Sequence, residues 1–215
     1  MRGRSRQTLL LLGLTVVSGM VDATAYLGLG HVFVVNMTGN VVILGLALGG
    51  AADFTTAGCL VALAAFMLGT VAAGWLHGRP RPLRGVTLAV ESALLALAAA
   101  VAAREGGTPY PAVAVLGLAM GMRTASVRLG GVSDITTTVI TSTLAWLGAN
   151  LSVAAGGGAG RRLGAIVLLL AGAATGALLT LRVGAAAALL AAVVVQVAVT
   201  LAYVLAPGRP AASGS

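Results

Sequence analysis

A carboxylate, a phenol and a hydroxyl share one helical stripe inside the first long apolar run of the chain. Ser18, Asp22 and Tyr26 are spaced four residues apart, which places them on one face of a continuous helix. A carboxylate at membrane depth costs about 3 kcal/mol on insertion scales, so we expect Asp22 to be kept for a purpose. Such polar groups can replace part of the hydration shell of a small solute.

A second polar cluster follows in the same run, at residues 36–40 with the sequence Asn-Met-Thr-Gly-Asn. Asn36 and Asn40 share a face at helical spacing. Gly39 weakens a helix, so we expect the segment to break at Thr38-Gly39-Asn40. Irregular polar backbone at membrane depth is tolerated where it is buried in protein or lines a cavity. The cluster is therefore a candidate solute site.

A related polar set lies in the second half of the chain. Asp134, Thr138 and Ser142 form one stripe, and Thr137 and Thr141 lie beside it. Two interpretations stay open for all these groups: a solute site, or hydrogen bonds that join packed helices. In the first, the substrate-binding residues are Ser18, Asp22, Asn36, Thr38, Gly39, Asn40, Thr137 and Thr141.

Glu91 and Arg123 are two further charges within apolar segments, and we interpret them as gating or coupling charges. Because an unpaired charge in lipid is costly, we expect Arg123 to form an ion pair with Asp22. That pair is either a static lock or a gate that responds to protons or substrate. In the alternative, Arg123 extends along the helix to reach the cytoplasmic interface.

Composition assigns the chain to the membrane. Of its 215 residues 59% are hydrophobic and 8% are charged, against about 25% charged in soluble domains. The net charge of +8 comes from arginines scattered in short links, which argues against nucleic-acid binding. The single Cys59 is expected to be a packing residue. No nucleophile–base pair or metal-binding motif is present in the sequence, so we expect neither enzymatic activity nor a cofactor.

The apolar residues gather in eight segments that form a single transmembrane domain over residues 1–215. Long apolar runs in lipid must be helices, so the expected fold is an all-α polytopic bundle. Residues 207–215 form a short polar tail that we expect to be frayed. The eight segments are 8–29, 32–48, 55–76, 85–103, 110–127, 132–154, 163–181 and 183–205.

A weak internal repeat relates two halves, at about 8–103 and 110–206, with an offset of about 102 residues. If segments 32–48 and 132–154 are broken or re-entrant, all arginine-rich links fall on one side. About six full spans then remain, in two pseudo-symmetric inverted halves with a cytoplasmic N-terminus in a bacterial inner membrane. The alternative is eight full spans, which violates the positive-inside rule.

The pattern Ser18-Gly19-x-x-Asp22, followed by Asn-Met-Thr-Gly-Asn at 36–40, resembles the YoaK family of bacterial membrane proteins. The resemblance covers essentially the whole chain, including the Thr-rich stretch at 137–141. It implies an integral inner-membrane protein of a family without an established activity. The second-half motif of the family is usually closer to Thr-Gly-Thr, whereas this chain has Thr-Ser-Thr at 141–143.

Two functional hypotheses follow. The first is a transporter or channel for a small polar solute that the sequence does not identify, acting from the lipid bilayer. The second is a non-transporting membrane scaffold or assembly protein, in which the polar groups only hold helices together. Self-association into a homo-oligomer is compatible with both. A hydrated cavity bounded by the polar segments would favour transport.

Overall fold

The computed structural model of the protein describes residues 2–51, 56–77, 84–104, 107–129 and 159–205. Within these ranges all regular secondary structure is α-helical, which confirms the all-α prediction. The helices are α1 (Arg2–Gly28), α2 (Met37–Leu48), α3 (Thr56–His77), α4 (Arg84–Ala102), α5 (Tyr110–Leu129), α7 (Ala159–Val183) and α8 (Ala185–Leu205).

Five of these helices are long and apolar enough to cross a membrane. They are the part of α1 from Leu10 to Gly28, together with α3, α5, α7 and α8. The apolar stretch of α4, Val86–Ala102, is shorter. A helix satisfies its backbone hydrogen bonds internally, which lipid requires of any spanning segment. The chain therefore has the form of a membrane helix bundle.

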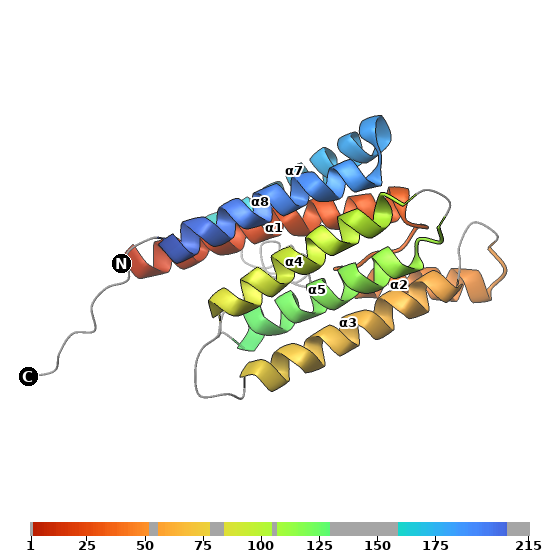
Figure 1. The fold of residues 1–215 in the computed structure, drawn as a ribbon, viewed down its shortest axis with the longest axis horizontal. Helices are drawn as coiled ribbons and strands as arrows, with labels where there is room; N and C mark the ends of the chain where they lie inside the picture. The colour runs from red at the N-terminus through yellow and green to blue at the C-terminus, as the bar shows by residue number, and fades with distance from the viewer. Residues whose placement is uncertain (1, 52–55, 78–83, 105–106, 130–158, 206–215) are drawn as a thin grey trace, which may run out of the picture.

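The six long helices lie side by side and alternate in direction (Figure 1). The start of α1, the end of α3 and the start of α4 lie at the end of the bundle that carries the N-terminus. The end of α5, the start of α7 and the end of α8 lie there too (Figure 1). Each of α1, α3 and α4 thus runs opposite to its counterpart α5, α7 or α8.

The short helix α2 does not follow this pattern. The end of α1 and the start of α3 both lie at the end of the bundle opposite the N-terminus (Figure 1). The chain between them therefore turns back into the bundle and leaves from the same end, with α2 on the outward path. The 12 residues of α2 correspond to roughly 18 Å at 1.5 Å per residue, short of the roughly 30 Å of a hydrocarbon core.

The predicted break at Thr38-Gly39-Asn40 is wrong in its position. These residues form the first turn of α2, and the irregular backbone lies just before it, at 29–36. Gly39 is needed for space, because a Cβ atom there would lie 2.6 Å from the Phe33 ring. Helix propensity alone therefore predicted the break at the wrong residues. The position of the break is set by packing and by side-chain hydrogen bonds to the loop before α2.

Close helix crossings join α1 to α7. A Cβ atom at Gly172 would overlap the carbonyl oxygen of Val16, and one at Gly19 would overlap the carbonyl oxygen of Leu169. A Cβ atom at Gly176 would likewise overlap the backbone of Met20. The Gly-x-x-x-Gly spacing in α7 thus permits backbone contact between two helices, as such spacings do in membranes.

A second close crossing joins α3 to α5. A Cβ atom at Gly69 would overlap the carbonyl oxygen of Leu118, and one at Gly121 would overlap that of Phe66. The two crossings leave α4 and α8 in contact with each other, with α4 also packing on α5 and α8 on α1. Four helices, α1, α4, α5 and α8, therefore surround the centre of the bundle.

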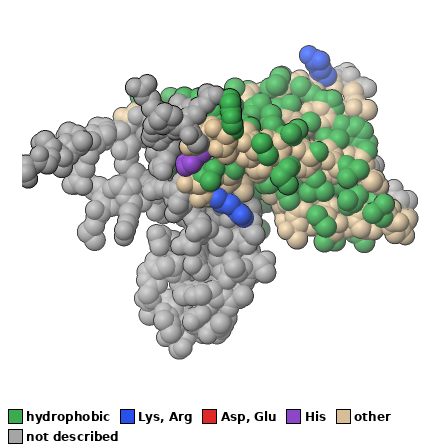
Figure 2. All heavy atoms as spheres, turned by 90° about the horizontal axis from the view of Figure 1, so that it is seen from below, with side chains coloured by type: hydrophobic (Ala, Val, Ile, Leu, Met, Phe, Trp, Pro, Cys, Tyr) green, Lys and Arg blue, Asp and Glu red, His purple; other side chains and the backbone are tan. Residues whose placement is uncertain are grey.

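The outer surface of the bundle is apolar. Large hydrophobic side chains are exposed along the long helices, and hydrophobic side chains are spread over the described part of the face in Figure 2. In water this surface would be unfavourable, whereas lipid tails solvate it without cost. Examples with more than half of their surface exposed are Met67, Val71, Trp75, Leu170, Leu181 and Val194.

Candidate functional site

Asp22 holds the loop between α1 and α2. Its Oδ1 atom accepts hydrogen bonds from the backbone amides of Val34 (2.9 Å) and Val35 (2.7 Å). Its Oδ2 atom accepts one from the amide of Asn36 at 3.1 Å. Successive backbone amides that converge on one carboxylate form an anion nest, and the ionised acceptor strengthens each bond. Asp22 therefore satisfies backbone groups that the loop could not pair by itself.

Asn40 holds the same loop at a different residue, Phe33. Its side-chain oxygen accepts a hydrogen bond from the Phe33 amide at 2.8 Å, and its side-chain nitrogen donates one to the Phe33 carbonyl at 2.6 Å. The Phe33 ring stacks on Tyr26, with ring centroids 5.0 Å apart. Tyr26 in turn makes an edge contact with His31. These contacts hold the irregular loop 29–36 in place against α1 and α2.

A pocket of about 540 Å³ lies against this loop. Val35, Asn36, Met37 and Thr38 form its inner wall, so the residues that Asp22 holds also line the pocket. The other walls come from the later turns of α3 and α5. Because those helices both end at the N-terminal end of the bundle, the pocket extends from the loop toward that end (Figure 1). These walls contain Phe66, Thr70, Gly74, Thr124, Ala125, Arg128 and Leu129.

A separate cluster of buried polar side chains joins the four central helices. The Nε atom of Arg123 donates to Glu91 Oε2 at 3.2 Å, and its NH2 group donates to Gln196 Oε1 at 2.7 Å. The Gln196 amide nitrogen donates to the same Glu91 oxygen at 3.3 Å. Glu91 and Gln196 are 1% and 0% exposed, and Arg123 is 5% exposed. Each member thus has a partner, as burial in a low dielectric demands.

The guanidinium of Arg123 also reaches α1. Its NH1 group lies 3.4 Å from both the Leu14 carbonyl oxygen and the Ser18 hydroxyl. The Ser18 hydroxyl donates its own proton to the Leu14 carbonyl at 3.0 Å. Arg123 thus provides a polar link between α1 and α5, two helices that make few other contacts in the described part of the chain.

The predicted ion pair between Asp22 and Arg123 is wrong. Arg123 pairs with Glu91, while Asp22 accepts from the backbone of the loop. The interface alternative for Arg123 is also wrong, because its side chain is buried in the cluster. Both predictions used position along the sequence, which does not say which way a side chain turns around its helix.

The structure distributes the predicted site residues over two places. Asn36 and Thr38 line the pocket, whereas Asp22 and Asn40 hold its wall and Gly39 makes room for that wall. Ser18 lies in the buried cluster with Glu91 and Arg123. Thr137 and Thr141 lie outside the described residues.

Several residues of these two places were not predicted. Gln196 completes the buried cluster, and Thr70, Thr124 and Arg128 belong to the lining of the pocket. A glutamine in the otherwise apolar segment 183–205 is a signal that could have been used, because an amide in lipid needs a partner. The threonines carried no such signal, since each can bond its own helix. Among the described residues, no group of three or more His, Cys, Asp or Glu side chains could hold a metal ion.

Fold and site together define a class: a polytopic α-helical membrane protein with an irregular polar loop before α2, a pocket beside that loop and a buried charged cluster. Residues 10–202 match the family described as "Protein of unknown function (DUF1275)", and the chain belongs to that family. It is 38% identical over 148 residues to the UPF0700 transmembrane protein YoaK of Bacillus subtilis (strain 168).

That match covers 66% of this chain and 65% of the relative, so the chain spans about two thirds of the relative's length in the comparison. The resemblance to the YoaK family is thereby confirmed, and with it the membrane location of the chain. No solved structure matches the chain. The names of the family and the relative specify no substrate.

Proposed function

We propose that this protein is a transporter or channel for a small polar solute, with the pocket beside the α1–α2 loop as its solute site. The observation that carries the proposal is the pocket of about 540 Å³ lined by Asn36, Thr38, Thr70 and Thr124. Ligand sites in helical membrane proteins combine apolar walls with a few placed polar groups beside interrupted helices. This pocket has both features.

The topology that goes with this function has six full crossings and a re-entrant segment at α2. Support comes from the length of α2 and from the common end at which α1 finishes and α3 begins (Figure 1). Eight full spans would require α1 and α3 to run in the same direction, and they do not. We assign the shorter apolar stretch of α4 as the sixth crossing because it runs the length of its neighbours.

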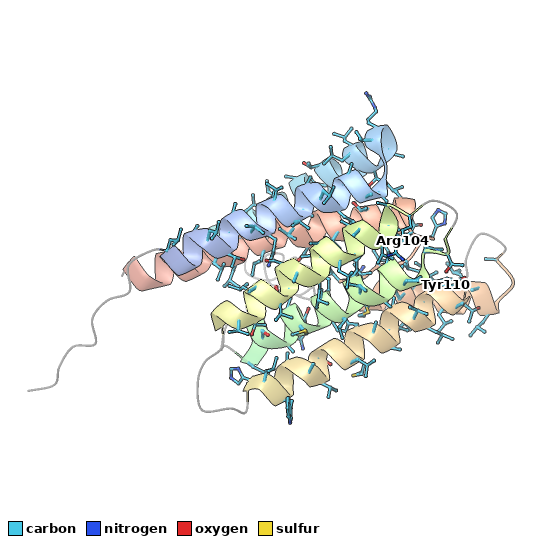
Figure 3. The ribbon with its side chains drawn as sticks, in the orientation of Figure 1. Arg104 and Tyr110 are labelled. Atoms are coloured by element: carbon cyan, nitrogen blue, oxygen red, sulfur yellow. The ribbon has the colours of Figure 1, made fainter. Side chains whose placement is uncertain are left out.

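Arginine placement supports a cytoplasmic N-terminus in a bacterial inner membrane. Arg2, Arg84 and Arg128 lie on helix ends at the N-terminal end of the bundle, as do the other arginines of α1 and those at the start of α7. Arg104 lies at the opposite end with Tyr110 (Figure 3). An excess of positive charge marks the cytoplasmic side. The pocket then opens toward the cytoplasm.

Two pseudo-symmetric inverted halves are supported by the helix crossings. Gly19 meets the carbonyl of Leu169, and Gly121 meets that of Phe66. Gly172 meets Val16, and Gly69 meets Leu118. The two contacts named in each sentence above are counterparts. Shifting both residue numbers of one contact by about 102, toward the other half of the chain, gives the second contact to within one residue. In such repeats each half provides one side of a central pathway.

In this proposal the ion pair of Glu91 and Arg123 joins the two halves of the chain, and it is also a candidate gate. Glu91 belongs to the first half, Arg123 to the second, and their ion pair at 3.2 Å therefore crosses the boundary between halves. Transport by rocking one half against the other must rearrange contacts at that boundary. A buried network of hydrogen bonds can switch between two discrete sets of partners, as such a rearrangement requires.

A scaffold without transport is the second candidate, and one observation favours it. The hydrogen bonds of Asp22 and Asn40 are made with the chain's own backbone, as expected of groups that only stabilise a fold. Uptake experiments separate the two candidates. Metabolite profiling of a deletion strain supplies test solutes, and purified protein in proteoliposomes is then assayed for their uptake. Uptake above that of empty liposomes supports transport; its absence for every solute altered in the strain supports a scaffold.

A further inference from the structure

The buried cluster gives Arg123 hydrogen-bond acceptors beyond its ion-pair partner. Glu91 Oε2 accepts from its Nε atom at 3.2 Å, and Gln196 Oε1 accepts from its NH2 group at 2.7 Å. Its NH1 group lies 3.4 Å from both the Leu14 carbonyl oxygen and the Ser18 hydroxyl. Neutral acceptors on α1 and α8 therefore stay beside the guanidinium if its bond to Glu91 is broken.

Glu91 depends on Arg123 for its counter-charge. Within the described helices, Arg123 is the charged residue that faces it from α5, whereas Arg128 of the same helix lies in the pocket lining. From α8 it meets the neutral amide of Gln196, and α8 contains no Asp, Glu, Lys, Arg or His. Asp22, the other acidic residue of the described chain, accepts from loop amides instead. Separation from Arg123 would leave an ionised Glu91 buried without a counter-charge, whereas a protonated Glu91 is neutral.

The cluster lies nearer to the N-terminal end of the bundle than to the opposite end. Glu91 lies seven positions after Arg84, the start of α4, which is roughly 10 Å at 1.5 Å per residue. Arg123 lies six positions before Leu129, the end of α5, which is roughly 9 Å. Both helix ends are at the N-terminal end of the bundle (Figure 1). The proposed topology places the cytoplasm there, so cytoplasmic water is the nearer source of a proton.

The helices that carry the cluster also hold the walls of the pocket. Thr124, which follows Arg123 directly on α5, lines the pocket. Ser18 lies on α1 one turn before Asp22, which holds the loop at the inner wall of the pocket. A movement of α5 relative to α1 and α4 therefore changes the cluster and the pocket together.

We propose that Glu91 is a proton-binding site and that the proton bound there is the coupling ion of the transporter. A proton from water adds to the Glu91 carboxylate, which becomes a neutral carboxylic acid. Arg123 keeps its own proton and its charge, and its neutral acceptors on α1 and α8 stay in place. The ion pair that joins the two halves is then released, and deprotonation of Glu91 restores it. This inference rests on the proposed transport function and adds the coupling ion and the residue that binds it.

The test follows the distance between the two halves in the full-length protein as the pH changes. Cys59→Ala removes the native thiol, and nitroxide labels are attached at Arg104→Cys and Arg182→Cys. Arg104 lies just after α4, the last helix of the first half, and Arg182 lies in the last turn of α7 (Figure 3). Electron paramagnetic resonance measures the distance between the labels in liposomes. We expect a shift of about 5 Å, the scale of a one-turn movement, as the pH falls from about 8 to about 4.

Three variants on α4 separate a proton site from a static lock. Glu91→Gln is neutral at every pH and similar in shape, so the distance should stay at its low-pH value throughout. Glu91→Asp holds its carboxylate farther from Arg123, so the midpoint of the response should move to higher pH by about one unit, a tenfold change in proton affinity. Ser92→Ala is the matched control, because its hydroxyl bonds the Leu88 carbonyl, and it should keep the full response.

The contrary outcomes are distinct. A distance that does not change with pH in the unmodified protein, or that changes equally in Glu91→Gln, overturns the proton site. So does an unshifted midpoint in Glu91→Asp, which is the decisive variant if Glu91→Gln does not assemble. Solute uptake into proteoliposomes that ignores an imposed pH gradient and continues in Glu91→Gln overturns proton coupling and leaves transport standing. A pH response that Glu91→Gln abolishes, without uptake of any solute altered in the deletion strain, keeps Glu91 as a proton site and overturns the transport function.

Discussion

The ion pair between Glu91 and Arg123 allows a double-mutant test of the buried cluster. The three variants are Glu91→Leu, Arg123→Met and the combination of both. Each single change leaves the other charge buried in the bundle, where Glu91 is 1% and Arg123 is 5% exposed. The combination removes both charges and replaces them by apolar side chains of similar length.

The magnitudes follow from what each variant leaves unpaired. Removing one partner of a buried ion pair costs about 3 to 5 kcal/mol, because the remaining charge stays desolvated. The double variant leaves no charge, but Gln196 loses its two side-chain partners. An unsatisfied buried amide costs about 1 to 3 kcal/mol. We therefore expect the double variant to be destabilised less than either single variant.

The assay is reversible unfolding of the purified protein in mixed micelles, titrated with sodium dodecyl sulfate and followed by circular dichroism. Ser92→Ala is the matched control on the same helix. Its hydroxyl donates to the Leu88 carbonyl at 2.8 Å within α4 and not to either charge. The control should shift the free energy of unfolding by less than about 0.5 kcal/mol.

The refuting result is additivity. If the double variant lost the sum of the two single losses, Glu91 and Arg123 would not be coupled, and the cluster would not be an ion pair in the folded protein. Single variants as stable as the unmodified protein would contradict the burial of the pair. In either case, the assignment of these charges to the boundary between the halves would have to be withdrawn.

Two further predictions concern the loop and the helix crossings. Asp22→Asn should raise hydrogen exchange at the amides of loop 29–36 by about tenfold or more, because bonds to a charged acceptor are weakened or lost. Mass spectrometry of the protein in nanodiscs measures this. Gly172→Ala should destabilise the bundle by about 1 to 3 kcal/mol, since the added Cβ meets the backbone of Val16. Gly164→Ala on the same helix has open space and should be neutral or stabilising.

Each of these predictions has its own contrary outcome. Thr15→Ala is the control for the exchange experiment, because the Thr15 hydroxyl bonds within α1 to the Leu11 carbonyl. If hydrogen exchange at the loop amides rose equally in Thr15→Ala and Asp22→Asn, the cause would be a general destabilisation of α1. The loss of the Asp22 hydrogen bonds to the loop would then not explain the result. For the crossing, equal stability of Gly172→Ala and Gly164→Ala in the same unfolding assay would mean that α1 and α7 are not in backbone contact.

Much of the fold was predictable from local hydropathy. Seven of the eight apolar segments correspond to helices that the structure describes, and the eighth, 132–154, lies outside the described residues. The prediction worked because lipid exposure and backbone pairing act on each segment separately. Arginine placement also disfavoured a full span at 32–48, where the structure has the 12-residue helix α2, and the number of full spans stays a prediction.

The candidate site was predictable only in part. The polar residues between Ser18 and Asn40 were identified, but not their division between a pocket wall, a loop clamp and a buried cluster. Asp22 and Ser18 lie on one helical stripe, yet one bonds a loop and the other approaches Arg123. One turn of helix separates them, and different neighbours lie beside each turn. Sequence spacing gives the shared face but not those neighbours.

The sequence by itself determined the membrane class, the helices, the family motif and the costly carboxylate at Asp22, because these depend on composition and short-range spacing. Only the tertiary structure decided that Arg123 pairs with Glu91, that Gln196 joins them and that the loop before α2 lines a pocket. The partners of Arg123 come from residues 32 and 73 positions away in the chain. Their meeting depends on how helices rotate and cross, which glycine contacts between distant segments set.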